Sequence, residues 1–166
     1  MSPISLDTLF QPFGGCLVQT IYGPVSVRVR RGRVSDIDPI PAHLADAIDS
    51  NGASGDLAGM VAAELADPDA APPTPLLREG TDFQWLVWDE LRRTRPGDRL
   101  TYSELATRCG RPNAVRAVGA ACAANRHALL IPCHRIVRKD GQLGEYRWGA
   151  DLKAVLLASE AAAAGK

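Results

Sequence analysis

Alternating apolar and polar positions mark the first regular part of the chain, between residues 15 and 38. From Val25 to Arg30 a valine stands at every second position with a polar residue between, which is the period of a half-buried strand. Gly23-Pro24 before this stretch and Arg31-Gly32-Arg33 after it are turn signals. The pattern predicts a small antiparallel meander of strands.

The spacing of apolar residues becomes helical in the next part of the chain. Residues 42–50 and 55–66 predict two helices, the second with its large apolar side chains on one face. Residues 67–76 hold four prolines, which do not fit inside a helix, and we expect a linker there. The predicted organisation is an N-terminal α/β support domain over residues 1–76 and a C-terminal domain over residues 77–166.

Helical spacing returns at the start of the C-terminal domain. Thr81 or Asp82 is a suitable cap for a helix that stops before Pro96-Gly97. The apolar face expected for this helix consists of Phe83, Leu86, Val87 and Leu91.

Two further short helices predict a helix-turn-helix. Thr101 and Glu104 have the spacing of a capping box, which predicts a helix over residues 102–109 ended by the next glycine. Pro112 suits the first turn of a third helix, which is expected to run to about Asn125. The short connection between them is typical of the helix-turn-helix motif.

The third helix has an unusual composition. Alanine and glycine fill seven of its positions from 114 to 124, and Arg116 is its one charged residue. One interpretation is a thin helix that approaches another surface closely and offers Arg116 to it. The other is tight packing in the core with Arg116 solvated, and the composition does not choose between them.

Composition and cysteine spacing narrow the class of protein. A hydrophobic content of 46% and a charged content of 23% are ordinary for a soluble globular protein. No apolar run approaches the roughly 20 residues that span a bilayer, and no lysine or arginine precedes Arg28, so no signal peptide is expected. The four cysteines contain no Cys-x-x-Cys pair, which favours free thiols in a reducing cytoplasm.

The net charge of zero hides a difference between the two halves. Residues 1–80 hold 5 Lys and Arg against 10 Asp and Glu, whereas residues 81–166 hold 14 against 9. A basic half favours contact with a polyanion on that side of the protein. An ordinary solvated surface is the alternative.

The segment 129–137 carries the candidate chemistry. It is apolar up to Cys133, which His134 follows directly. A cysteine nucleophile reacts as the thiolate and needs a base or a positive environment, for which His134 and nearby arginines are candidates. Neighbours in a strand point to opposite faces, so His134 is expected to reach Cys133 at a bend or through a water. A buried structural cysteine is the alternative.

A metal site is not predicted. The three histidines and four cysteines lack the spacing of zinc ligands. We therefore expect neither a metal nor another cofactor.

The sequence around Cys133, Ile-Pro-Cys-His-Arg-Ile-Val, resembles the active-site signature of the O6-alkylguanine-DNA alkyltransferases. The similarity covers about residues 80–160, and residues 1–79 match in outline alone. The implied fold is a two-part α/β (α+β) chain. A small N-terminal antiparallel sheet with helices, of RNase H-like outline, precedes a mainly helical domain with the helix-turn-helix and the active-site cysteine. Further similar stretches, in the family's order, are 81–88, Gly97, 100–103, 116–119, Asn125 and 146–149.

The resemblance implies a role for each residue near the cysteine. Cys133 is expected to accept the alkyl group, with His134 acting as base through a water and Glu160 orienting His134. Asn125 is expected to hold the turn between the third helix and the Cys133 segment. A hydrogen bond from Tyr146 to the flipped guanine is also implied, and the residues expected to form the guanine pocket are Tyr146, Arg147 and Trp148.

A second group of residues is expected to act on DNA. Tyr102 would press on the phosphate 3′ of the lesion and rotate the nucleotide outward, and Arg116 would fill the vacated place in the base stack. Ser103 and Arg135 complete the expected DNA contacts. One departure from many relatives is Arg126-His127-Ala128, where they carry prolines, and this affects the expected width of the pocket.

The implied function is direct-reversal DNA repair. A monomer in the cytoplasm would bind double-stranded DNA, flip out O6-alkylguanine and move the alkyl group irreversibly to Cys133. Activity on O4-alkylthymine and cooperative binding along DNA stay open. The alternatives are a cysteine hydrolase that uses Cys133, His134 and Glu160, a non-catalytic lesion-binding module, and a helix-turn-helix regulator. The alanine-rich third helix lacks the polar base-reading side chains expected of a regulator.

Overall fold

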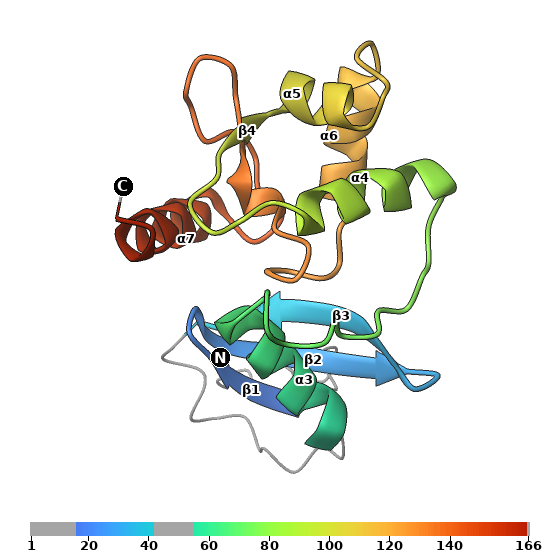
Figure 1. Cartoon of the computed structure of the whole chain (residues 1–166), viewed down its shortest axis with the longest axis vertical. Coiled ribbons are helices and arrows are strands. Elements are labelled where there is room, and N and C mark those ends of the chain that lie inside the picture. The colour runs from blue at the N-terminus through green and yellow to red at the C-terminus, as the bar shows by residue number, and fades with distance from the viewer. Residues whose placement is uncertain (1–15, 42–54, 166) are drawn as a thin grey trace, which may run out of the picture. The chain divides into compact units, whose positions relative to one another are not determined.

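A computed structural model of the chain describes residues 16–41 and 55–165 (Figure 1). The chain divides into two compact units, Met1–Leu77 and Arg78–Lys166. The helix predicted over residues 42–50 lies outside the described residues.

The first unit contains the predicted meander. Strands β1 (Cys16–Thr20), β2 (Gly23–Arg30) and β3 (Arg33–Pro39) pair antiparallel in that order. The first turn lies at Ile21-Tyr22 and not at Gly23-Pro24, because the Thr20 side chain closes it. The Thr20 hydroxyl accepts from the Tyr22 backbone N–H at 3.1 Å and donates to the Gly23 carbonyl at 2.7 Å. Gly23 has φ of 98°, which suits a glycine at the start of β2.

Helix α3 (Gly55–Ala66) is the predicted second helix, and it packs against β1. Its buried residues share the core of this unit with alternate residues of the strands. The core includes Val25, Val27, Val34, Ile37, Val61 and Leu65.

The proline-rich segment 67–76 does not run free of this unit. Leu76 forms a parallel bridge with Val34, whose backbone N–H donates to the Pro75 carbonyl at 3.0 Å. Thr74 and Leu76 are buried. The end of the segment therefore extends the sheet beside β3, where its prolines are compatible with an edge position.

The second unit opens with helix α4 (Asp82–Arg92), and its cap is Thr81, one of the two predicted caps. Thr81 and Gln84 form a capping box. The buried face differs from the predicted one, because Leu86 is 39% exposed and the two tryptophans turn inward instead. Residues buried along α4 are Trp85, Val87, Trp88 and Leu91.

The helix-turn-helix consists of α5 (Tyr102–Arg108) and α6 (Val115–Ala123), which pack on each other (Figure 1). The capping box of Thr101 and Glu104 is confirmed. Helix α6 begins three residues after Pro112, which is therefore in the preceding turn and not in the helix. One face of α6 is buried and bonded to α4, since Trp88 Nε1 donates to the Ala121 carbonyl at 2.8 Å. The other face, with Arg116, is exposed.

A short parallel pair of strands brings distant segments together. Strand β4 (Leu100–Thr101) pairs with β5 (Ile136–Val137), Leu100 opposite Ile136. Tyr102 directly follows β4, and the 3-10 helix η2 (Cys133–Arg135) directly precedes β5. Helix α7 (Ala150–Ala163) packs against η2. The pairing and the packing of α7 therefore position the candidate site.

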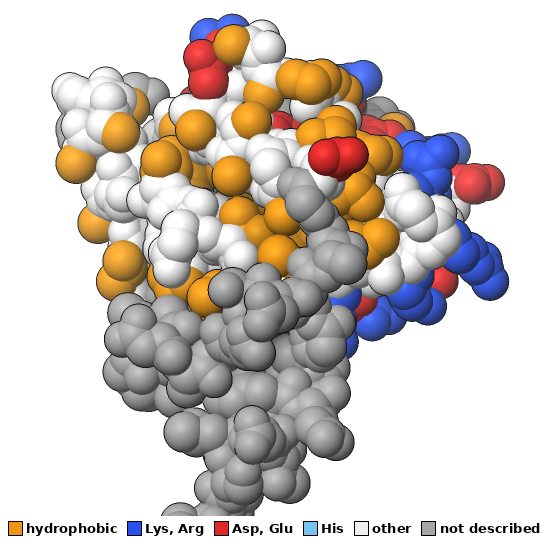
Figure 2. Space-filling view, turned by 90° about the horizontal axis from the view of Figure 1, so that it is seen from below, with side chains coloured by type: hydrophobic (Ala, Val, Ile, Leu, Met, Phe, Trp, Pro, Cys, Tyr) orange, Lys and Arg blue, Asp and Glu red, His pale blue; other side chains and the backbone are white. Residues whose placement is uncertain are grey.

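Most large apolar side chains of the described residues are buried. Figure 2 shows one face of the molecule, where hydrophobic side chains share the surface with polar atoms and Lys and Arg gather along one edge. The large apolar side chains exposed among the described residues are Ile21, Leu86, Val115 and Val155. They lie on four different segments.

Candidate active site

Cys133 lies in the first turn of η2, at the bend that the sequence requires for a cysteine and an adjacent histidine to cooperate. Asn125 holds this turn from the end of α6. Its Nδ2 donates to the Ile131 carbonyl at 2.9 Å and to Cys133 Sγ at 3.1 Å, and its Oδ1 accepts from the His127 backbone N–H at 2.8 Å. Asn125 is fully buried, so these bonds replace the water that its amide would otherwise bind.

The thiol of Cys133 is 6% exposed. Burial raises its pKa, while the Asn125 hydrogen bond and the positive charges of Lys153 and Arg147 oppose that rise. The net effect is a pKa above the ordinary value of a cysteine. The resting group is therefore a thiol, and the reactive thiolate requires a base.

His134 is placed to be that base. Its Nε2 lies 2.9 Å from Glu160 Oε1, and its Nδ1 is buried without a hydrogen-bond partner among the described residues. Burial lowers the pKa of His134, against the opposing effect of Glu160. A neutral ring whose Nε2–H donates to Glu160 keeps a lone pair on Nδ1. That nitrogen is free to accept a proton.

Glu160 anchors a buried polar network. Arg135 donates to its carboxylate from Nε at 3.0 Å and from Nη2 at 2.8 Å, and the Gly97 backbone N–H donates at 3.1 Å. Burial alone would raise the pKa of Glu160, but the hydrogen bonds of His134 and Arg135 outweigh it and lower the pKa to about 2. Glu160 is therefore ionised, and its charge favours a protonated His134.

The position of Arg135 does not fit the predicted DNA contact. The side chain is buried, and Nη1 donates to the backbone carbonyl and the hydroxyl of Thr94 at 2.7 and 2.9 Å. With Nε and Nη2 bound to Glu160, the guanidinium faces the interior. A buried Glu160 needs a paired cation, and this requirement turns Arg135 inward.

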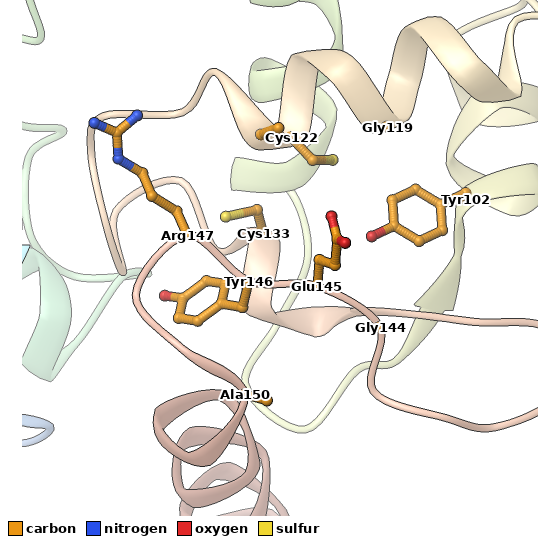
Figure 3. Close-up of a pocket in the computed structure, with 10 residues that line it drawn as sticks. Tyr102, Gly119, Cys122, Cys133, Gly144, Glu145, Tyr146, Arg147 and Ala150 are labelled. Carbon is orange, nitrogen blue, oxygen red and sulfur yellow. The ribbon is translucent and has the colours of Figure 1, made fainter.

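A cavity of about 510 Å³ opens over Cys133 (Figure 3). Tyr146 lines it, and its hydroxyl is buried without a hydrogen-bond partner among the described residues. Burial raises the pKa of Tyr146, and Cys133 and Glu160, when they are ionised, add to the effect. Its hydroxyl therefore stays protonated and can donate a hydrogen bond to a ligand. The lining residues are Tyr102, Gly119, Cys122, Ala123, Cys133, Gly144, Glu145, Tyr146, Arg147 and Ala150.

The predicted guanine-pocket residues differ in how they meet this cavity. Arg147 lines it, but Figure 3 shows its guanidinium directed away from Cys133. Trp148 is not a lining residue. It packs behind Tyr146, with the two ring centroids 5.2 Å apart, and so restricts the movement of the tyrosine ring.

The predicted DNA-contact residues divide in a similar way. Tyr102 lines the cavity and also a neighbouring one with Arg138 and Gln142. Ser103 on α5 and Arg116 on α6 are exposed and do not line the Cys133 cavity. Gly119 on α6 lies beside Tyr102, and a Cβ at this position would be in ordinary van der Waals contact with the tyrosine ring, at 3.9 Å.

Lys153 is an important residue that the sequence interpretation missed. It is fully buried in α7, and Nζ donates to the backbone carbonyls of Leu143 and Glu145. These bonds hold the loop that carries Tyr146. The available signal was helical spacing, because Lys153 shares the buried face with Leu156, Leu157 and Glu160.

Within residues 16–41 and 55–165, no group of three or more His, Cys, Asp or Glu side chains is arranged to hold a metal ion. No helix among these residues is long and apolar enough to cross a membrane.

The chain is similar to known proteins in sequence and in fold. Residues 82–162 match the family model described as 6-O-methylguanine DNA methyltransferase, DNA binding domain. In structure, the chain is similar to Mycobacterium tuberculosis OGT in complex with DNA, with a TM-score of 0.68 and 28% identity. That match covers 89% of this chain and 92% of the other. In its two-part fold and its helix-turn-helix, the chain thus resembles the alkyltransferases.

Curated relatives support the same family. The bifunctional transcriptional activator/DNA repair enzyme Ada of Escherichia coli is 50% identical over 101 residues, which are 61% of this chain and 28% of that protein. The methylated-DNA–protein-cysteine methyltransferase of Saccharomyces cerevisiae is 49% identical over 81 residues, 49% of this chain and 43% of that protein. The matches thus span less than half of either relative. Residues 82–162 thus match the O6-alkylguanine-DNA alkyltransferase family, and the chain shares the fold of a solved member.

Proposed function

We propose that this protein repairs O6-alkylguanine in DNA by moving the alkyl group to Cys133. The observation that carries the proposal is a buried thiol at the base of a cavity, bonded to Asn125 and followed directly by the His134–Glu160 pair. This arrangement supplies a nucleophile, a base and an orienting carboxylate in one place. A similar protein of Saccharomyces cerevisiae is named a methylated-DNA–protein-cysteine methyltransferase.

The reaction balances without a cofactor. Cys133 Sγ attacks the alkyl carbon, the S–C bond forms and the bond from that carbon to guanine O6 breaks. The thiol proton passes to His134 Nδ1, through a water if the two groups are not in direct contact. A proton returns to the guanine, so the products are a thioether and ordinary guanine. Tyr146, whose hydroxyl is buried in the cavity wall, donates a hydrogen bond to the departing base.

The remaining groups of the network assist this step. Glu160 stays ionised and favours the imidazolium that forms when His134 takes the thiol proton. Arg135 keeps Glu160 in place and Asn125 supports the developing thiolate. A thioether has no route back to a thiol at this site, so each molecule reacts once.

The alkyl carbon of a lesion is hidden inside the duplex, so the nucleotide must leave the stack at a cost of a few kcal/mol. We assign this task to the helix-turn-helix. Arg116 is exposed on a helix of small residues, and its insertion into the stack would offset part of the cost. Tyr102 joins this helix to the cavity, where it would press on the phosphate beside the lesion.

Double-stranded DNA is therefore the proposed partner of a monomeric protein that works in the cytoplasm, where Cys133 stays reduced. Binding is expected to rest on phosphate contacts rather than on base reading, since few polar side chains are exposed on α6. Affinity for undamaged duplexes should then fall steeply with salt and vary little with sequence. Affinity that is insensitive to salt would count against this part of the proposal.

The central test is transfer of label from a duplex that carries an isotopically labelled methyl group on guanine O6. Peptide mapping by mass spectrometry should find one label per molecule, on Cys133. Cys133→Ala should abolish transfer and keep DNA binding. Cys122→Ala is the matched control, because this second cavity cysteine has a pKa raised to about 12, chiefly by burial. Label on Cys122, or repeated turnover by one molecule as in a cysteine hydrolase, would contradict the proposal.

A further inference from the structure

The cavity over Cys133 contains a carboxylate that the proposed reaction does not use. Of its lining residues, Glu145 and Arg147 are the charged ones. In Figure 3 the Glu145 side chain points into the space between Cys133 and Tyr102, whereas the Arg147 guanidinium points away. Glu145 therefore presents the charge that a bound base meets first.

The position of Glu145 is supported by two further observations. The carboxylate points toward the Tyr102 hydroxyl (Figure 3), and its charge raises the pKa of Tyr102, after burial and the two cavity cysteines. Its backbone carbonyl accepts from Lys153 Nζ at 3.4 Å, which ties the loop to α7. The Glu145 backbone is thus tied to α7, and the side chain, which is exposed, lines the cavity near Tyr102.

The direction of entry decides which part of a substrate lies beside Glu145. The alkyl carbon must meet Cys133 Sγ, so O6 points to the cysteine. The sugar and phosphates stay on the side of the helix-turn-helix, which contributes Tyr102, Gly119 and Ala123 to the cavity. The base then occupies the space between Cys133 and Tyr102. Glu145 faces an edge of the base rather than the alkyl group.

A carboxylate accepts hydrogen bonds and cannot donate them when ionised. O6-alkylguanine retains an exocyclic amine at N2, which is a donor. O4-alkylthymine offers acceptors alone at its ring nitrogen N3 and at O2. A carboxylate beside the base edge is therefore attractive to the first lesion and repulsive to the second.

We propose that Glu145 selects O6-alkylguanine over O4-alkylthymine by accepting a hydrogen bond from the exocyclic amine of the base. The inference rests on the proposed alkyl transfer to Cys133 and adds its substrate class. Loss of one hydrogen bond to a charged group corresponds to about a tenfold change in rate or more. Glu145 is a specificity residue, since the reacting atoms lie at Cys133.

The test compares two ratios of second-order rate constants for labelling of Cys133. The first is O6-methylguanine over O4-methylthymine in the same duplex. The second is free O6-benzylguanine over free O6-benzylhypoxanthine, which lacks the amine and needs no extrusion. Glu145→Ala should lower both ratios by about tenfold or more. Glu145→Gln, whose amide oxygen is a neutral acceptor, should lower them by less. Asp151→Ala, which removes an exposed carboxylate outside the cavity, should leave both unchanged.

The outcomes separate this inference from the proposed function. Unchanged ratios in Glu145→Ala, with Cys133 still labelled, would overturn the role of Glu145 and leave alkyl transfer standing. Absence of label on Cys133 of the wild-type protein with every substrate would overturn both. If Glu145→Ala does not fold by thermal melting, Glu145→Gln decides, and unchanged ratios in that variant would overturn the role.

Discussion

His134 is bound through one ring nitrogen, because Nε2 lies 2.9 Å from Oε1 of Glu160 while Nδ1 has no partner in the described part of the chain. An unpaired buried nitrogen is costly, typically about 1–3 kcal/mol. The unpaired Nδ1 beside the nucleophile has a function if it takes the proton of Cys133.

The rate of reaction with free O6-benzylguanine should depend on pH through His134. Burial lowers the pKa of His134 below 6.5, so the ring stays neutral at pH 6.5 and the rate should fall only at lower pH. In His134→Gln the thiol must ionise unaided. Because burial raises the pKa of Cys133 above 9.0, the rate should then be low at pH 7 and rise beyond pH 9. Stopped-flow or quench measurements from pH 5 to 10 would check this, and parallel profiles for the two proteins would refute the role of His134.

Glu160→Gln should destabilise the protein by about 3–5 kcal/mol, since it leaves buried Arg135 without its charge partner. The folded pKa of about 2 is below the ordinary 4.5, so the Glu160 charge stabilises above pH 4.5 and this contribution is lost as pH falls toward 2. The difference in free energy of unfolding between wild type and variant should therefore become smaller as the pH falls from 4.5 toward 2. Urea unfolding at several pH values measures it. Asp151→Asn, an exposed carboxylate on the same helix, is the control. A difference in unfolding free energy that does not change with pH would contradict the Glu160–Arg135 ion pair.

Asn125→Ala should reduce both stability and reactivity. It removes the acceptor of the His127 backbone N–H, at a cost of about 1–3 kcal/mol, and one of the two donors to the Ile131 carbonyl, which keeps the Cys133 N–H. It also removes the donor that lowers the pKa of Cys133, so transfer should be slower. Asn125→Asp keeps the acceptor for His127 but turns a carboxylate oxygen toward Sγ, and it should slow transfer further. Thermal melting and O6-benzylguanine kinetics check both effects, with exposed Asn113→Ala as the control.

Arg116 and Tyr102 should act on extrusion of the base rather than on the chemistry. Arg116→Ala should slow transfer from duplex DNA by a large factor and transfer from free O6-benzylguanine much less. Tyr102→Ala should show the same division, with some loss on the free base because Tyr102 also lines the cavity. His134→Gln, by contrast, should slow both substrates. Rate constants for the two substrates provide the comparison. Equal losses on both for Arg116→Ala would show that the wedge assignment is wrong.

The elements that depend on neighbouring residues were predictable from the sequence. The meander follows from period-two valines, and the starts of α4 and α5 follow from Thr81 and Thr101, because a cap bonds backbone groups two or three positions away. The first turn and the start of α6 were misplaced by one or a few residues. The Thr20 side chain decided the position of the first turn, and the turn that contains Pro112 decided the start of α6. In both cases the predicted and the observed positions have similar sequence signals.

Long-range packing decided the rest. His134 lies 26 residues and Gly97 lies 63 residues from Glu160 in sequence, yet both are hydrogen-bonded to the Glu160 carboxylate. The sequence by itself determined which residues carry the chemistry, because the motif around Cys133 is local. The tertiary structure alone decided that Arg135 faces inward, that Lys153 is buried and that Glu145 enters the cavity. The direction of a charged side chain depends on the partners that folding brings to it, because a buried charge requires a partner of opposite charge.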